Sequence, residues 1–154
     1  MTDLPVRRTA RVLFLDPEGR TLLFEGRDPQ NPTAGTWWFV PGGGVEDHET
    51  DEMAAVREIF EETGQRISGL GEPVATVRST FSFMNRPIRQ DSIYFVKETE
   101  TFDVDRSGWS RGETESITDA RWRSLNDLET TADVLWPENL VATLRSALRR
   151  RAVD

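Results

Sequence analysis

One segment of the 154-residue chain, residues 42–65, carries acidic side chains at helical spacing within the run GGGVEDHETDEMAAVREIFEETGQ. At about 100° per residue, Glu58, Glu61 and Glu62 fall within roughly 100° of one another on a helix. Carboxylates one helical turn apart offer the oxygen ligands that Mg²⁺ and Mn²⁺ prefer, and they leave coordination positions for phosphate and water. The spacing therefore indicates a divalent-cation site on one face of a helix.

An ordinary solvated acidic face is the alternative interpretation of this cluster. Like charges at i, i+3 and i+4 repel when they are exposed, and pairing of Arg57 with Glu61 at i+4 offsets part of that repulsion. In either case Met53, Val56 and Phe60 group on the opposite side of the helix, which we expect to face the core. The cluster alone leaves both interpretations open.

The surrounding sequence resembles a known motif. Residues 43–65 match the Nudix box, written G-x5-E-x7-R-E-U-x-E-E-x-G-U, at all seven fixed positions. The matching residues are Gly43, Glu49, Arg57, Glu58, Glu61, Glu62 and Gly64. Only the closing apolar position departs, because Gln65 stands there and Ile67 is the nearest aliphatic residue. The chain therefore resembles the Nudix hydrolase family, and TWWFVPGG before the box and ARWRSLNDL after it resemble the family's flanking segments.

The resemblance implies an enzyme that hydrolyses a nucleoside diphosphate linked to another moiety, with Mg²⁺ or Mn²⁺ as cofactor. By this resemblance Glu61 and Glu62 correspond to the principal metal ligands, and Glu58 corresponds to a further ligand or to the general base. The carbonyl of Gly42, just before the box glycine, resembles the family's backbone ligand.

Arg57 and Glu49 resemble the family's pair that orients the catalytic helix. A bidentate guanidinium fixes a carboxylate better than a lysine can, which suits that role. Attack on an anionic pyrophosphate by water also needs metal ions that screen the phosphate charge and lower the pKa of the water. Cations bound at the acidic face would make an acidic protein compatible with an acidic substrate.

An acid outside the box completes the site in some family members, where a glutamate stands immediately before the tryptophan of a late strand. This chain has Arg121 before Trp122, so that role is not transferred. Glu113 and Glu115 are candidates through their proximity in sequence, with an exposed loop as the alternative interpretation.

Basic and aromatic residues are candidates for substrate binding. The basic candidates, in expected loops, are Arg27, Arg86 and Arg89. The aromatic candidates for stacking on a base are Trp37, Trp38, Phe81 and Phe83. Arginines are mostly surface residues, and aromatic residues in strands commonly belong to the core, so a structural role stays open for each.

The first half of the chain predicts the elements that position the box. A hairpin is expected from residues 11–16 and 21–25, around a turn at Gly19. An aromatic strand at residues 36–40 then leads into the glycine run, which we expect to be a loop. A helix over residues 50–63 follows, ended by Gly64 at a C-terminal cap position.

The second half predicts two antiparallel strands at residues 73–83 and 91–96, with the turn residues Asn85 and Pro87 between them. Residues 97–118 read as a long exposed loop, and in a compact domain such a loop is often functional. A strand at residues 120–124 and a closing helix at about residues 138–150 complete the chain.

Composition suits one domain over residues 1–154, because 17.5 kDa with 36% hydrophobic and 30% charged residues matches a single core. A net charge of −8 argues against broad neutralisation of nucleic-acid phosphates, so we expect no stable nucleic-acid binding. The absence of cysteine excludes disulfides and a cysteine nucleophile and fits the cytoplasm. No apolar run approaches the roughly 20 residues of a membrane span, so we expect no membrane contact.

We therefore expect an α/β protein, a Nudix-type α/β/α sandwich with a mixed β-sheet, acting on a small-molecule nucleoside diphosphate derivative. A non-catalytic Nudix-fold nucleotide sensor is the alternative, although such modules commonly lose box carboxylates and this chain keeps them. An isomerase or an enzyme that removes oxidised nucleotides also stays open. Residues 79–83 match none of the family's specificity signatures, and a homodimer is an open expectation.

Overall fold

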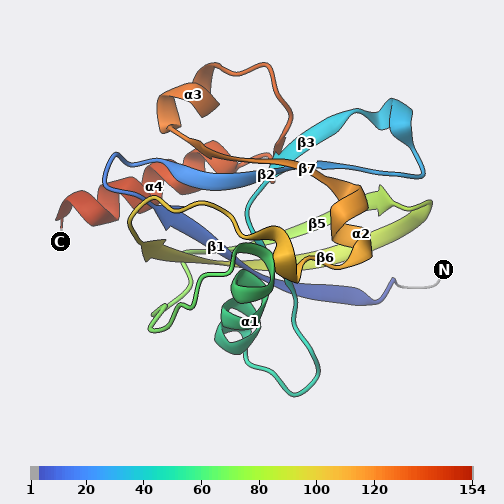
Figure 1. Ribbon diagram of the computed structural model, residues 1–154, viewed down its shortest axis with the longest axis horizontal. Helices are drawn as coiled ribbons and strands as arrows, with labels where there is room; N and C mark the ends of the chain where they lie inside the picture. The colour runs from blue at the N-terminus through green and yellow to red at the C-terminus, as the bar shows by residue number, and fades with distance from the viewer. Residues whose placement is uncertain (1–3, 154) are drawn as a thin grey trace.

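Strands β1 (Val6–Leu15) and β2 (Thr21–Arg27) lie at the centre of the molecule in the computed structural model, which describes residues 4–153 (Figure 1). A tight turn containing Gly19, at φ 78°, joins them. The expected hairpin is wrong, because the two strands belong to different sheets. Each carries a near-continuous apolar run, which suits a strand that is covered on both faces and pairs with other neighbours. The turn carries the chain from one sheet to the other.

Within residues 4–153 the strands form two four-stranded sheets, a first sheet of order β4-β1-β6-β5 and a second of order β7-β2-β3-β8. The other strands are β3 (Thr36–Phe39), β4 (Gly42–Gly44), β5 (Ala75–Phe83), β6 (Arg86–Glu98), β7 (Ile117–Arg123) and β8 (Leu135–Trp136). β1 pairs parallel with β6 and β3 with β8, and the other pairs are antiparallel, including β5 with β6 as predicted. The expected mixed pairing is confirmed, in two sheets instead of one.

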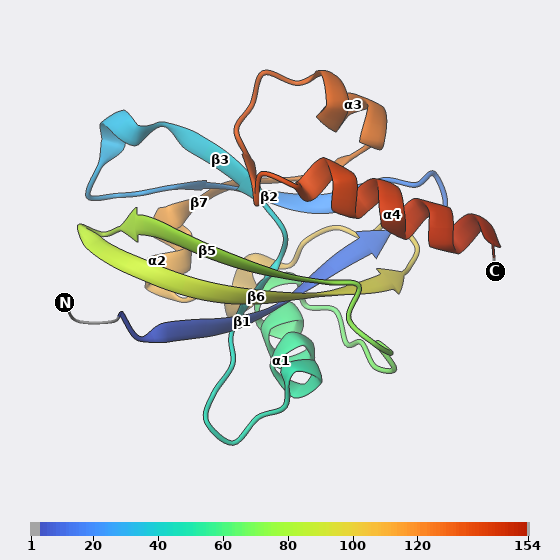
Figure 2. The same cartoon turned by 180° about the vertical axis from the view of Figure 1, so that it is seen from behind.

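Helices lie on opposite sides of the sheets, with α1 on one side and α3 and α4 on the other (Figures 1 and 2). The helices are α1 (Asp51–Thr63), α2 (Arg111–Ser116), α3 (Leu125–Thr130) and α4 (Leu140–Val153). Adjacent residues of β1 point to different layers, since Phe14 belongs to the core cluster that contains Ile59 of α1, whereas Leu13 belongs to the cluster that contains Leu144 of α4. The predicted α/β/α sandwich is confirmed.

The ends of α1 follow the sequence prediction. Thr50 caps the N-terminus by accepting a hydrogen bond from the Met53 backbone N–H at 3.1 Å. Gly64, at φ 80°, ends the helix and donates its backbone N–H to the Phe60 carbonyl at 2.9 Å.

The buried face of α1 differs in part from the expected one, although Val56 packs against the core as predicted. Met53 is 51% exposed and Phe60 is 42% exposed, whereas Ala55 and Ile59 are fully buried. Glu62 continues this buried stripe at i+3 from Ile59, so the carboxylate face and the core face overlap. Small alanine side chains let the helix approach β1 and β4 closely. This close packing, more than the size of the apolar side chains, decides which face of the helix is buried.

The region expected as a loop at residues 97–118 contains two short helices, the 3-10 helix η2 (Arg106–Gly108) and α2. A capping box begins α2, because the Ser110 hydroxyl accepts the Glu113 backbone N–H and the Glu113 carboxylate accepts the Ser110 backbone N–H. A helix this short shows no hydrophobic periodicity, and the S-x-x-E pattern of its capping box is the local feature in the sequence that would have predicted it.

Other boundaries shift by a few residues. β1 begins at Val6 instead of residue 11, β6 begins at Arg86, β7 begins at Ile117, and α4 runs from Leu140 to Val153. Ile67 packs against the core beneath α1, so it takes the apolar place that Gln65 leaves in the box. Over residues 4–153 no helix is long and apolar enough to cross a membrane.

Candidate active site

The glycine run forms β4, an edge strand of the first sheet, instead of the expected loop. It pairs antiparallel with β1, with Gly43 opposite Ala10. Gly42 adopts φ 147°, and a Cβ there would collide with the Ala10 carbonyl oxygen. A Cβ at Gly43 would collide with the carboxylate of Glu58. The absence of side chains therefore lets α1 place its carboxylates against the backbone of β4.

Arg57 braces α1 against the segment before it. Its Nε and Nη2 donate to the two carboxylate oxygens of Glu49 at 2.8 Å each, and Nη2 also donates to the Gly44 carbonyl at 2.9 Å. Its Nη1 donates to Glu58 Oε1 at 2.9 Å. The hydrogen bonds that Arg57 donates to Glu49 lower the pKa of Glu49 to about 2, and the same bonds raise the pKa of Arg57. One guanidinium thus holds the loop, β4 and the helix in a single arrangement.

Three carboxylates converge beside β4. Glu58, Glu62 and Glu113 each offer an oxygen, and these oxygens lie within 4.8 Å of one another. Glu62 is 3% exposed, and its Oε2 accepts the Gly42 backbone N–H at 3.2 Å. Burial raises the pKa of Glu62 well above its ordinary value, and burial also raises the pKa of Glu58 in spite of Arg57. A cation bound among these acids would offset their mutual repulsion and the cost of burying their charges, so the arrangement favours a cation site.

The remaining acidic candidates lie differently. Glu61 lines the same cavity with its side chain 45% exposed, at 3.5 Å from Arg57 Nη1, but it is not one of the three converging acids. Glu115 is exposed, and its carboxylate accepts from Arg111 at 3.2 Å. The structure therefore brings Glu113 to the site, and it leaves Glu115 outside the cavity lining formed by residues 4–153.

The segment at residues 105–109 covers the C-terminal end of α1. The Asp105 backbone N–H donates to the Thr63 carbonyl at 3.0 Å, and the Trp109 indole donates to the Glu62 carbonyl at 2.7 Å. Gly108 fits against the Glu61 carbonyl, where a Cβ would collide. Helix carbonyls without intrahelical partners are thus satisfied by a segment distant in sequence.

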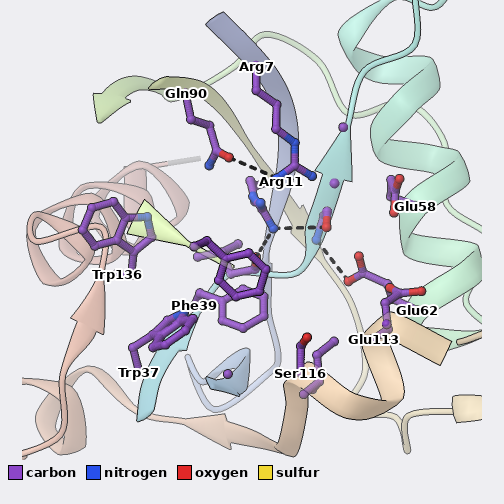
Figure 3. A pocket seen from close by; sticks show the side chains of 18 of the residues that line it. Arg7, Arg11, Trp37, Phe39, Glu58, Glu62, Gln90, Glu113, Ser116 and Trp136 are labelled. Carbon is purple, nitrogen blue, oxygen red and sulfur yellow. Dashed lines mark hydrogen bonds between the residues drawn. The ribbon is translucent and has the colours of Figure 1, made fainter. Parts of the chain in front are cut away.

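A cavity of about 760 Å³ extends from these acids between the two sheets. Its far end is lined by Trp37, Phe39, Phe81, Phe83 and Trp136, which we call the aromatic end. The converging carboxylates of Glu58, Glu62 and Glu113 form the acid end (Figure 3). Trp38, by contrast, is 3% exposed and packs in the core under α4. Three of the four aromatic candidates therefore line the cavity, and the fourth is structural.

The basic candidates are only partly placed at the cavity. Arg27 lines it, with its Nε donating to the Glu115 carbonyl at 2.8 Å. Arg86 and Arg89 lie on β6 outside the lining formed by residues 4–153, so the structure does not bring them to this cavity, and a role for them in substrate binding stays a prediction. Arg86 is exposed beside the tip of the β5–β6 hairpin, where turn residues face solvent.

Two arginines that the sequence analysis did not select line the cavity instead. Arg7 and Arg11 come from one face of β1, and Figure 3 shows them between the aromatic side chains and the acids of α1. Arg11 Nη1 donates to the Gly42 carbonyl at 3.1 Å, and Arg7 Nη1 donates to Gln90 Oε1 at 3.5 Å. The alternating R-x-T-x-R pattern at residues 7–11 places Arg7 and Arg11 on one face of a strand, but the predicted strand begins at Arg11 and leaves Arg7 out.

The fold and the box agree with a family assignment, since the profile of the NUDIX domain matches residues 5–144. The chain belongs to the Nudix family. Among solved structures, the MutT protein from Methanosarcina mazei Go1 superposes with a TM-score of 0.72 at 20% identity, covering 98% of this chain and 99% of that one. A Caenorhabditis elegans Ap4A hydrolase superposes with a TM-score of 0.63 at 20% identity, covering 96% and 99%. These similarities show the fold.

Curated relatives match over part of their length. The RNA pyrophosphohydrolase of Sphingopyxis alaskensis is 34% identical over 80 residues, which are 52% of this chain and 48% of that protein. The RNA pyrophosphohydrolase of Dinoroseobacter shibae is 39% identical over 61 residues, 40% of this chain and 36% of that protein. The alignments thus span about one third to one half of these relatives.

Proposed function

We propose that this protein is a divalent-metal-dependent pyrophosphohydrolase that cleaves a nucleoside diphosphate linked to another moiety. The observation that carries the proposal is a single cavity with buried, converging carboxylates at one end, arginines between, and aromatic side chains at the other. These chemistries suit, in that order, a cation, a pyrophosphate and a nucleobase. Family membership supports the same reaction class.

The donor set at the acid end fits Mg²⁺ or Mn²⁺, because it consists of carboxylate oxygens beside a backbone strand. Glu58, Glu62 and Glu113 would hold the ion, and the resemblance adds Glu61 and the Gly42 carbonyl. When bound, the cation screens phosphate charge and lowers the pKa of water. Arg11 already donates to the Gly42 carbonyl, whose second lone pair stays available to a metal.

The protein's own residues then have distinct roles. Glu58 faces β4 and is held by Arg57 at 2.9 Å, so it has two alternative roles: a metal ligand beside Glu62, or the general base that accepts a proton from the attacking water. Arg57 and Glu49 orient α1 and do not need to touch the substrate. Arg7 and Arg11 are placed to bind the phosphates, because planar guanidinium groups match phosphate oxygens bidentately.

The nucleoside part of the substrate belongs at the aromatic end. Base stacking on aromatic side chains tolerates any base, so the cavity alone does not choose one. The curated relatives are named RNA pyrophosphohydrolases, and a phosphorylated RNA 5′ end therefore belongs among the substrates to be tested. With a net charge of −8, we propose that a small nucleotide or a short RNA end is engaged, without stable binding along a nucleic acid. We further propose one cytoplasmic domain over residues 1–154, with dimerisation to be measured.

Hydrolysis of a substrate panel tests the proposed function. The panel contains nucleoside triphosphates, oxidised triphosphates, ADP-ribose, nucleotide sugars, dinucleoside polyphosphates and 5′-triphosphorylated RNA, each with Mg²⁺, Mn²⁺ or chelator. Product release that disappears with chelator and in Glu62→Gln would establish the activity and supply the substrate class. Tight binding of one member without hydrolysis would instead favour the sensor, in which the acid end only holds a ligand.

A further inference from the structure

A buried carboxylate joins the two sheets at the aromatic end. Asp28 directly follows β2 and is 5% exposed. Its Oδ1 accepts the Gln30 backbone N–H at 3.0 Å, and its Oδ2 accepts the Met84 backbone N–H at 2.9 Å. Met84 lies at the tip of the β5–β6 hairpin, 56 positions further along the chain and in the other sheet. One side chain therefore latches the hairpin tip of the first sheet to the β2–β3 connection of the second.

The hairpin tip needs this support. Met84 and Asn85, between β5 and β6, have φ angles of 55° and 62°, so two adjacent non-glycine residues are left-handed. Asparagine tolerates this conformation, but for methionine it costs free energy that the surroundings must offset. Besides the bond from Met84 to Asp28, Asn85 Nδ2 donates to Gln30 Oε1 at 3.2 Å. Both turn residues are thus held from the β2–β3 connection.

The latch lies beside the aromatic wall of the cavity. Phe83, immediately before the turn, contacts Trp37 of β3 edge to face, with ring centroids 6.3 Å apart and an interplanar angle of 87°. Phe83 and Met84 line the cavity from the first sheet, and Trp37 lines it from the second. The separation of these two walls therefore depends on how firmly the hairpin tip is attached.

We propose that Asp28 is a positioning residue that fixes the Phe83 wall against the Trp37 wall and so sets the affinity for a nucleobase. This inference rests on the proposed function for the placement of the base. Asp28 acts through two neutral backbone amides, of Gln30 and Met84, neither of which belongs to α1, so loosening the latch weakens base binding and leaves the acid end intact. Loosening the latch should therefore lower the affinity for ligands that carry a nucleobase and leave the affinity for ligands without a base unchanged.

The test compares Asp28→Ala and Asp28→Asn with Asp91→Asn as the matched control. Asp91 pairs with Arg78 at 2.8 Å across the same hairpin and lies outside the cavity lining of the described residues. Values of kcat and KM are measured with the best nucleotide of the panel, and inorganic pyrophosphate serves as a competitive inhibitor without a base. Asp28→Ala should raise KM about tenfold, with kcat and the pyrophosphate inhibition constant unchanged.

The conservative variant Asp28→Asn should recover part of the KM, because its amide oxygen still accepts one backbone N–H, and Asp91→Asn should behave as wild type. An unchanged KM in Asp28→Ala would overturn the proposal, and so would an equal loss of nucleotide and pyrophosphate affinity. If Asp28→Ala does not fold, the same values of KM, kcat and pyrophosphate inhibition are measured in Asp28→Asn and in Gln30→Ala. Gln30→Ala removes the hydrogen bond from Asn85 Nδ2 to Gln30 Oε1.

Failure of the proposed function is distinguishable from failure of the latch. If wild-type protein hydrolyses no member of the panel, ADP and pyrophosphate are titrated against tryptophan fluorescence in wild type and in the two Asp28 variants. Weaker ADP binding with unchanged pyrophosphate binding in the variants would still support the latch. Equal ADP affinity in all three proteins would overturn it.

Discussion

The two ends of the cavity are held in place by different interactions. At the acid end, Arg57 makes charge-assisted hydrogen bonds to Glu49, Gly44 and Glu58, all at 2.8 to 2.9 Å. At the aromatic end the side chains meet edge to face, with Trp37 and Phe83 at 6.3 Å and one carboxylate fastening the hairpin beside them. Charge-assisted bonds are directional and strong, whereas aromatic contacts are weak singly and tolerate small shifts.

This difference matches what each end has to do. Reaction at a phosphorus depends on placement to within a fraction of an ångström, which the braced helix supplies. Recognition of the rest of the substrate can vary without disturbing the reaction. Exchange of aromatic side chains should therefore change substrate preference and leave the chemistry intact, whereas changes at the acid end should reduce the turnover of every substrate.

Loss of a carboxylate at the acid end should have the largest effect. Glu62→Gln is expected to reduce kcat by at least about 100-fold, because removing groups that merely orient metal ligands already costs about 10- to 100-fold. The metal-free fold should be kept, since the substitution nearly preserves shape and removes a buried charge. Turnover and thermal unfolding are measured beside Glu115→Gln, an exposed acid outside the cavity that should behave as wild type.

Glu61→Gln sharpens the same comparison, because Glu61 is a principal ligand by resemblance yet lies outside the converging acids. We expect it to abolish metal-dependent turnover with the fold intact. Full activity in Glu61→Gln together with loss in Glu62→Gln would restrict the metal site to the three converging acids. Unfolding of either variant would indicate a structural role.

Arg57→Lys should have the next largest effect. A lysine cannot donate to both oxygens of Glu49 and to Gly44 and Glu58, so α1 loses its fixed orientation and kcat should fall about 10- to 100-fold. KM should change little, because Arg57 does not need to touch the substrate. Arg78→Lys removes an equivalent bidentate interaction, the exposed pair of Arg78 with Asp91, and is the control in steady-state kinetics. An undiminished rate in Arg57→Lys would contradict its orienting role.

Trp37→Ala at the aromatic end should have a smaller and different effect. We expect KM for a nucleotide to rise by up to about tenfold, with kcat nearly unchanged, because stacking contributes to binding alone. Phe60→Ala, an exposed aromatic residue on α1, is the control for general loss of an aromatic side chain. A fall in kcat without a rise in KM would remove the distinction between the two ends.

The pH dependence of stability should show the smallest effect. The pKa of Glu49 is lowered from 4.5 to about 2, chiefly by its hydrogen bonds from Arg57. The pair therefore contributes stability that is fully present above pH 4.5 and is lost as the pH falls toward 2. Urea unfolding at pH 7 and pH 3 should show a larger loss for wild type than for Glu49→Gln. Equal losses would mean that the brace adds nothing to stability.

The acid end was largely predictable from the sequence, because most of it is continuous in the chain. Helix spacing and caps fixed by Thr50 and Gly64 are local properties, so the relative positions of Glu58 and Glu62 follow from the chain alone. The buried face of α1 is only partly predicted, because the apolar residues opposite the acids, Met53 and Phe60 among them, do not decide which face is buried. The packing of Ala55 against the sheets decides it instead, and that is a long-range property.

The aromatic end was much less predictable. Trp37, Phe83 and Trp136 come from strands of two sheets, and their meeting depends on strand pairings that no local pattern specifies. The predicted hairpin of β1 and β2 is wrong for the same reason, because a tight turn between two strands does not determine whether they pair. Arg7 precedes the predicted start of the first strand at Arg11, so its place on β1 beside Arg11 is not predicted.

The segment over the C-terminal end of α1 has a consequence for local opening of the protein. Asp105 and Trp109 donate to the carbonyls of Thr63 and Glu62, so the last turn of α1 cannot separate from residues 105–109 without breaking both bonds. Backbone amides of the two segments should therefore exchange with deuterium together, as one cooperative unit, although they are more than 40 residues apart in sequence. A ligand that binds at Glu62 would then slow exchange in both segments at once.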